Sequence, residues 1–307
     1  MSLFSLIAVF LIEQLQPLDY RRIVADPVAA WADFIEKRFN AGSYSQGVAA
    51  WAIAVVLPVL LVGLLYALLY SLNPLLGWLL NVGVLYLTMG FRQFSHHFTE
   101  IQLALRLGDI ERARSLLAAW QGFASARYDS EEISRRAIEG ALGASHRHVF
   151  AVLVWFVILP GPCGALLYRL AAIIQARWAV VDVAEQNEFS VFSRQVFGII
   201  EWLPLRATAS AFAIVGDFED AVHCWRTQPA QWPDRDLGIV LAAGAGALGV
   251  QLARPVVDDG EVSDRGELGL GDPADVDLMQ RAVGLVWRAT VLWILLLFLL
   301  GLASLAG

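Results

Sequence analysis

The chain has 307 residues, of which 58% are hydrophobic and only 17% are charged. Soluble domains carry about 25% charged residues, so this composition excludes an ordinary soluble protein and predicts a polytopic membrane protein. The net charge of −7 and the lack of a basic stripe exclude nucleic acid as a partner. The two cysteines form neither a disulfide framework nor a metal-ligand spacing. We therefore expect an all-α helical bundle whose first partner is the lipid bilayer.

Apolar segments dominate the N-terminal third. Residues 1–15 form a short apolar helix that, at about 1.5 Å per residue, barely reaches across a hydrocarbon core of about 30 Å. Residues 39–91 contain no Asp, Glu, Lys or Arg. Because one membrane helix needs about 20 residues, this stretch predicts a hairpin with arms at 48–70 and 75–91. Its turn is the Ser-Leu-Asn-Pro sequence at 71–74.

A polar region with helical periodicity follows at residues 92–147, and it holds eight arginines and seven acids. Gly108 and Asp109 mark the end of one predicted helix and the start of the next, and the acids after Asp129 open a third. Arginine-rich connections stay on the cytoplasmic side of a membrane, so we place this region in the cytoplasm.

Residues 148–182 begin as a membrane helix, but the Pro-Gly-Pro sequence at 160–162 interrupts them. Proline removes a backbone donor, so a helix here must kink or split. Arg169, Arg177 and Asp182 follow the interruption. Charges beside a broken membrane helix indicate a functional site, because such breaks persist only where they face protein or water. The alternative is a kinked spanning helix whose arginines reach the lipid headgroups.

A second marginal apolar stretch, residues 195–216, contains Glu201 and Arg206. Isolated charges are costly in an apolar segment and need partners. One hypothesis is structural pairing, either with each other or with another segment. The other is recognition of an anionic substrate group, because a guanidinium matches the geometry of carboxylate and phosphate.

Glycine and alanine dominate residues 237–253, and residues 244–249 match the pattern G-x-G-x-x-G. No predicted strand precedes them, so the pattern favours close helix packing over dinucleotide binding. Residues 256–277 are strongly acidic, and residues 289–307 form a terminal membrane helix. We predict no metal site, because the clustered histidines are not at helical ligand spacing; these four are His96, His97, His146 and His148.

Several motifs together resemble one family. The run A-A-G-A-G-A-L-G-V-Q-L-A-R-P at 242–255, with G-E-L-G at 266–269 and D-V-D at 275–277, resembles the C-terminal signature of the CobD/CbiB family of cobalamin-biosynthesis integral membrane proteins. P-C-G-A-L-L-Y-R at 162–169 and W-L-P-L-R at 202–206 are similar to that family's P-G-A-x-x-Y-R and W-x-P-x-R. The resemblance runs nearly end to end.

The resemblance implies a multi-pass protein of the bacterial inner (plasma) membrane, with residues 1–307 as a single integral membrane domain. Within it we expect an N-terminal helix and hairpin (1–91), a cytoplasmic helical region (92–147), a broken-helix core (148–255), and an acidic loop with a terminal helix (256–307).

The implied activity is ATP-dependent amide formation, which joins aminopropanol or its phosphate to a carboxylate of adenosylcobyric acid. The resemblance implies ATP together with Mg²⁺, with no tightly bound cofactor, and the partner would be a corrinoid or another anionic small molecule. We expect Arg169, Arg177 and Arg206 to line one anionic pocket, with Glu201 or Asp182 nearby. Catalytic residues are not assigned, and the oligomeric state stays open.

Several polar positions depart from the family pattern. Its E-N pair is replaced near residues 144–146, and its paired aspartates before W-x-P-x-R by Phe197 and Gly198. Its P-N-A-G step is replaced at 234–238, and the histidine of its H-P-V by Asp26. The N-terminal residues and E-W-L-P-L-R also resemble the AmpE membrane protein. The alternative function is therefore an AmpE-like, non-catalytic membrane sensor or regulator.

Overall fold

The secondary structure is almost entirely helical. The structure is a computed structural model, and it describes residues 2–15, 18–122, 128–185, 188–253, 256–258, 261–263 and 267–306. The chain divides into two units: unit 1 comprises Met1–Gly90 and Ala151–Pro204, and unit 2 comprises Phe91–Phe150 and Leu205–Gly307. The sequence predicts a single domain, and this stays a prediction. The structure shows two compact units within the chain.

Within the described residues, four helices are long and apolar enough to cross a membrane. They are Tyr44–Leu72, Ser130–Ile158, Val191–Val215 and Val276–Ala303. Shorter apolar helices occupy Leu3–Leu15 and Pro74–Thr88. The predicted all-α membrane bundle is confirmed. One helical run, Ser130–Ile158, passes through residue 147, and the predicted bounds of the polar region stay a prediction.

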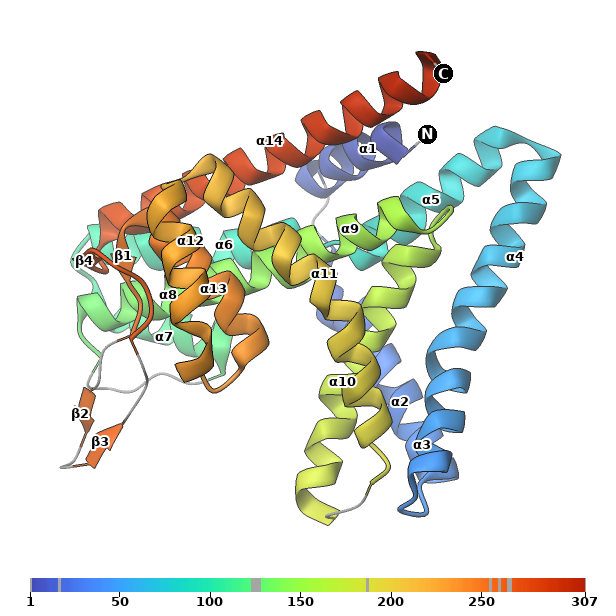
Figure 1. Ribbon diagram of the computed structural model, residues 1–307, viewed down its shortest axis with the longest axis horizontal. Helices are drawn as coiled ribbons and strands as arrows, with labels where there is room; N and C mark the ends of the chain where they lie inside the picture. The colour runs from blue at the N-terminus through green and yellow to red at the C-terminus, as the bar shows by residue number, and fades with distance from the viewer. Residues whose placement is uncertain are drawn as a thin grey trace. The chain divides into compact units, whose positions relative to one another are not determined.

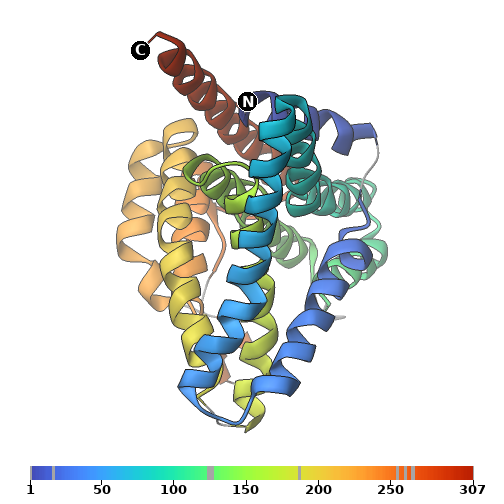
Figure 2. The ribbon, with the colours of Figure 1, turned by 90° about the vertical axis from the view of Figure 1, so that its right-hand side faces the viewer.

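Unit 1 contains α1 (Ser2–Leu15), η1 (Arg21–Ala25), α2 (Asp26–Phe39), α3 (Tyr44–Trp51), the π-helical turn η2 (Ala52–Val56), α4 (Leu57–Leu72), α5 (Pro74–Thr88), α9 (Ala151–Ile158), α10 (Cys163–Glu185) and the first part of α11 (Val191–Val215). The predicted hairpin is confirmed, because α4 and α5 are joined by a tight turn and contact each other (Figure 1). Its turn is set locally: the Asn73 side chain accepts a hydrogen bond from the Leu75 amide at 2.8 Å. Helix α10 packs against α2, α4 and α5 (Figure 2).

The Pro-Gly-Pro interruption splits the segment into two helices. Helix α9 ends at Ile158, Gly161 adopts a φ of 64°, and α10 begins at Cys163. A Cβ at Gly164 would overlap the Trp155 carbonyl, so the first turn of α10 lies directly against α9. The interpretation as one kinked spanning helix is therefore wrong. The chain reverses here because the missing proline donor and the left-handed glycine end one helix and start another.

Unit 2 contains α6 (Phe91–Arg106), α7 (Ile110–Gln121), α8 (Ser130–Ser145), the π-helical turn η3 (His146–Phe150), the rest of α11, α12 (Phe218–Thr227), η4 (Pro229–Gln231), α13 (Arg235–Leu248) and α14 (Val276–Ala306). Two small sheets lie before α14. Strand β1 (Val250–Gln251) pairs in parallel with β4 (Asp272–Pro273), and β2 (Val256–Asp258) pairs antiparallel with β3 (Glu261–Ser263). The other residues of the acidic segment lie partly outside the described residues.

The glycine-rich segment is a packed helix, as the sequence predicts. Every residue of α13 from Gly238 to Leu248 is buried. A Cβ at Gly246 would lie 2.5 Å from the Asp220 carbonyl oxygen of α12, and a Cβ at Gly244 would lie 2.8 Å from the Leu142 side chain of α8. Gly249 ends the helix with a φ of 67°. The small residues of α13 therefore let α8 and α12 approach it closely, and the prediction of close helix packing is confirmed.

Candidate functional site

Arg169 caps the end of a neighbouring helix. Its side chain is buried, with 4% of its surface exposed. Its Nε donates to the Thr88 carbonyl at 2.8 Å, and its Nη2 contacts the same oxygen. Thr88 is the last residue of α5, where carbonyls have no intrahelical donor and where a positive charge is favourable. The guanidinium therefore stabilises the C-terminus of α5.

The same guanidinium lies 5.1 Å from the centroid of the Tyr20 ring, a cation–π distance. Burial raises the pKa of Tyr20 above its usual value, and the charge and hydrogen bond of Arg169 offset part of that rise. The Tyr20 hydroxyl is therefore neutral at physiological pH.

Glu201 of α11 contacts Tyr168, the residue before Arg169 on α10. The hydroxyl of the buried Tyr168 donates to Glu201 Oε1 at 3.2 Å. Glu201 is 5% exposed, and an isolated carboxylate in an apolar helix is costly. The hydrogen bond offsets part of that cost. Two consecutive residues of α10 therefore contact two other helices: Tyr168 contacts the Glu201 carboxylate of α11, and Arg169 contacts the last carbonyl of α5.

Arg177 forms a separate ion pair with α2. Its Nε and Nη2 donate to the two carboxylate oxygens of Asp33 at 2.6 and 2.8 Å. The hydrogen bonds from Arg177 lower the pKa of Asp33 below its usual value. Next to this pair, Trp178 Nε1 donates to the Ala32 carbonyl at 3.2 Å. These contacts dock α10 on α2.

The structure thus places Glu201 of α11 against Tyr168, the residue before Arg169 on α10, and pairs Arg177 with Asp33 instead. Arg206 is half-buried on α11 and belongs to unit 2. The side chain of Asp182 lies outside the described residues. The prediction that these five residues line one pocket stays a prediction.

Unit 2 contains a buried charge network that the sequence analysis missed. Glu132 forms ion pairs with Arg135 and with Arg136, whose Nε lies 3.0 Å from Glu132 Oε1. Arg135 Nη1 also donates to the Leu252 carbonyl at 3.3 Å. The signal that could have revealed the ion pairs is local, because residues three and four positions apart are neighbours on a helix.

Three of the histidines for which no metal site is predicted have other contacts. His96 Nε2 lies 3.4 Å from Glu100 Oε1, and His97 stacks on Trp120. His146 Nδ1 lies 2.9 Å from Thr208 Oγ1 in a fully buried pair. In the part of the chain that the structure describes, no group of three or more His, Cys, Asp or Glu side chains could hold a metal ion.

Comparison with known proteins places these features in one family. The model of the family described as "CobD/Cbib protein" matches residues 21–286, which covers most of both units. The chain belongs to the CobD/CbiB family. This CobD/CbiB protein is 35% identical over 280 residues to the "Cobalamin biosynthesis protein CobD" of Stutzerimonas stutzeri (strain A1501), which covers 89% of this chain and 90% of that protein.

Two further relatives extend the comparison. The protein named CobD in Chromobacterium violaceum is 35% identical over 220 residues, or 72% of this chain and 70% of that protein. The "Cobalamin biosynthesis protein CbiB" of Salmonella typhimurium (strain LT2) is 24% identical over 233 residues, or 74% of this chain and 72% of that protein. No solved structure matches this CobD/CbiB protein.

Proposed function

We propose that this CobD/CbiB protein acts in cobalamin biosynthesis as a multi-pass inner-membrane ligase. It would join aminopropanol, or its phosphate, to a carboxylate of adenosylcobyric acid with ATP. The observation that carries the proposal is the family match over residues 21–286, together with relatives named for cobalamin biosynthesis. The four apolar helices support its location in a membrane.

Three arginines are the proposed anion ligands. Arg206 belongs to the W-L-P-L-R motif, so we assign it as one cation for a phosphate or carboxylate group. Arg169 would have to leave the Thr88 carbonyl before it could bind an anion. Arg177 would have to exchange Asp33 for the ligand.

ATP would enter together with Mg²⁺ as a reactant. Magnesium in nucleotide sites keeps several waters and takes one or two carboxylates together with substrate phosphates. The described residues hold no group of three or more His, Cys, Asp or Glu side chains that could hold a metal ion. Glu201 and Asp182 remain the acids that we propose near the arginines.

The decisive assay uses the full-length protein in detergent or nanodiscs. It is incubated with ATP, Mg²⁺, adenosylcobyric acid and aminopropanol phosphate, and the amide product is detected by mass spectrometry. We expect product above a denatured control, and we expect R206Q to abolish it. The matched control is R226Q, an exposed arginine of α12 in the same unit. No product, alongside an active relative, would overturn the ligase proposal.

An AmpE-like, non-catalytic sensor or regulator is the second proposal. Two observations favour it: Arg169 is occupied by helix capping, and Phe197 and Gly198 stand where the family has paired aspartates. The same purified protein distinguishes the two proposals. Binding of the corrinoid, measured by calorimetry, without any amide formation would support the sensor and contradict the ligase.

A further inference from the structure

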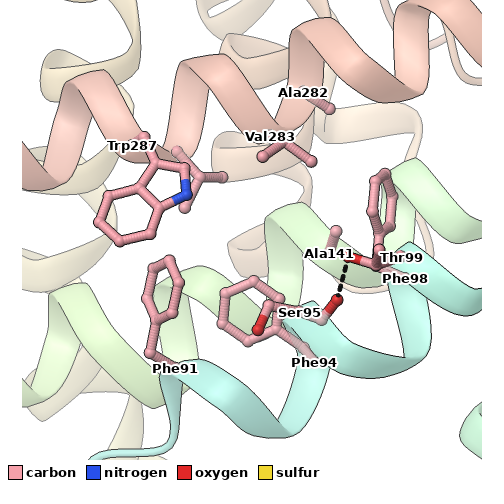
Figure 3. Close-up of a pocket in the computed structure, with 10 residues that line it drawn as sticks. Phe91, Phe94, Ser95, Phe98, Thr99, Ala141, Ala282, Val283 and Trp287 are labelled. Carbon is pink, nitrogen blue, oxygen red and sulfur yellow. Dashed lines mark hydrogen bonds between the residues drawn. The ribbon is translucent and has the colours of Figure 1, made fainter. Parts of the chain in front are cut away.

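The sequence R-A-T occurs twice in the chain, at 206–208 on α11 and at 288–290 on α14. The second copy bonds within its own helix. Arg288 Nε and Thr290 Oγ1 each donate to the carbonyl four residues earlier, at 3.3 and 2.8 Å. Trp287, the residue before this copy, lines a cavity beside α6 and α14 (Figure 3). The hydrogen bonds of the second copy thus stabilise α14 itself.

The threonine of the first copy contacts a different segment. The chain has five threonines, all in described helices, and the four other than Thr208 donate to a backbone carbonyl of their own helix. That is the usual bond of a helical threonine. Thr208 Oγ1 instead lies 2.9 Å from Nδ1 of His146, the first residue of the π-helical turn η3. Both side chains are fully buried, so this hydrogen bond joins α11 to the segment that follows α8.

The contacts around this polar pair are apolar. One turn further along both segments, Phe150 and Phe212 meet edge to face, with their ring centroids 5.7 Å apart. Ala209 packs in an apolar cluster with Ile239 and Ala243 of α13. Apolar burial has no direction, whereas a buried hydrogen bond requires that two atoms meet and is costly to leave unmade. Single buried polar contacts fix register between helices for this reason, so the polar pair fixes the rotation of this part of α11.

The rotation of α11 decides where Arg206 points. Successive residues of an α-helix are about 100° apart, so Arg206 lies about 200° around the helix from Thr208. Thr208 is buried, whereas Arg206 and Ala207 are half-buried. A rotation of α11 by one residue would turn Arg206 by about 100°. The contact of Thr208 with His146 on one side of α11 therefore sets the direction of the guanidinium on the other side.

We propose that His146 is a positioning residue: through Thr208 it fixes the rotation of α11, and so the direction in which Arg206 presents its guanidinium to an anionic substrate group. The proposal rests on the proposed function, in which Arg206 is one cation for a phosphate or carboxylate. Recognition of these groups by a guanidinium is directional, because its planar N–H donors must align with the oxygens. Loss of the polar pair would therefore weaken substrate binding although Arg206 itself is present.

The first test measures the direction of position 206 without catalysis. In the full-length C163S/C224S protein, R206C introduces a thiol, and its rate of reaction with a charged maleimide is measured. T208V and H146Q should each change this rate about threefold or more, because a polar contact between helices shifts populations by about that factor. Combining T208V with H146Q should change the rate no further, because both residues act through one hydrogen bond.

Two conservative variants show whether the hydrogen bond itself matters. T208S keeps the hydroxyl, and H146N places its amide the same number of bonds from the backbone as the imidazole Nδ1. H146Q places its amide one bond further away. T208S and H146N should therefore keep the thiol rate that is measured with R206C alone.

The second R-A-T sequence supplies the matched control. T290V also removes a buried hydroxyl, but one that bonds within α14, and it should leave the thiol rate at R206C unchanged. A thiol introduced by R288C should react at the same rate with and without T208V. A change at both positions would indicate a general loosening of unit 2 and would overturn the proposal.

The second test uses the amide-forming assay with aminopropanol phosphate. T208V and H146Q should raise KM for this anionic substrate about tenfold with a smaller change in kcat, because they weaken binding rather than remove a reacting group. T290V should change neither constant. Folded T208V and H146Q with unchanged thiol rates, or with changed thiol rates and an unchanged KM, would overturn the proposal. If wild type forms no amide, the ligase proposal fails, and the thiol rates alone decide the role of His146.

Discussion

The indole of Trp155 donates a hydrogen bond to the carbonyl of Ile200 at 3.0 Å. Ile200 lies four residues before Pro204, which is inside α11 and has no amide proton to give to that carbonyl. An unpaired carbonyl is costly in an apolar environment, so the tryptophan of α9 supplies the donor that the proline lacks. A proline within W-L-P-L-R is thereby tolerated in an apolar helix.

The first prediction is that Trp155 and Pro204 are energetically coupled. W155F keeps an aromatic ring but removes the donor, and it should lower the free energy of unfolding by about 1–3 kcal/mol. In a P204A background, the new amide of residue 204 can donate to Ile200, so W155F should cost less. Denaturant unfolding of the four proteins of a double-mutant cycle measures the difference. Equal costs of W155F in both backgrounds would contradict this role.

The second prediction concerns a repeat of this arrangement in the N-terminal hairpin. Trp31 Nε1 donates at 3.3 Å to the carbonyl of Ala54, four residues before Pro58. Because Trp31 is 36% exposed, W31F should cost only about 0.5–1.5 kcal/mol. P58A should reduce that cost. Thermal denaturation of the same four combinations tests it, and a cost unaffected by P58A would count against it.

The third prediction separates the two arginines of α10. R169A leaves the Thr88 carbonyl and the end of α5 without a donor in a buried place, so it should destabilise the protein by about 1–3 kcal/mol. R177A removes a half-exposed ion pair and should cost at most about 1 kcal/mol. Unfolding in detergent compares the two variants. A larger loss for R177A than for R169A would refute the capping role.

The fourth prediction is the pH dependence of the Asp33–Arg177 pair. The pKa of Asp33 is lower in the folded protein than its ordinary value of 3.8, because Arg177 donates to the carboxylate. The pair therefore stabilises the fold fully above that ordinary value, and its contribution is lost as pH falls through the lowered pKa. The difference in unfolding free energy between wild type and D33N should be constant near neutral pH and disappear in strong acid. A difference that grows on acidification would have the wrong sign.

The fifth prediction uses two glycines in opposite environments. G246A places a Cβ 2.5 Å from the Asp220 backbone carbonyl, so α12 and α13 must move apart, at a cost of about 1–3 kcal/mol. G198A places its Cβ in open space within α11 and should be neutral, or stabilising by up to about 1 kcal/mol. Melting temperatures of both variants make the comparison. A tolerated G246A would show that this close approach is unimportant.

Some of this structure could be predicted because its causes are local. The turn before Pro74 follows from an asparagine cap next to a proline, and the split at residues 160–162 follows from a missing donor and a left-handed glycine. The sequence predicts a packing role for Gly244 and Gly246, because a dinucleotide-binding loop would need a strand before it and none is predicted there. The charges before residue 147 predict a polar region, and the helix that contains them continues into the apolar residues up to Ile158.

The sequence by itself determined the family, the membrane bundle and the positions at which charged residues enter apolar helices. Only the tertiary structure decided what those charges contact. Arg169 meets a carbonyl 81 residues away, and Arg177 meets a carboxylate 144 residues away. Hydropathy and the missing amide donor of a proline depend only on residues close together in the sequence, so the sequence alone predicts their effects. The partner of a buried charge depends on which distant segments pack together, and no local pattern specifies that.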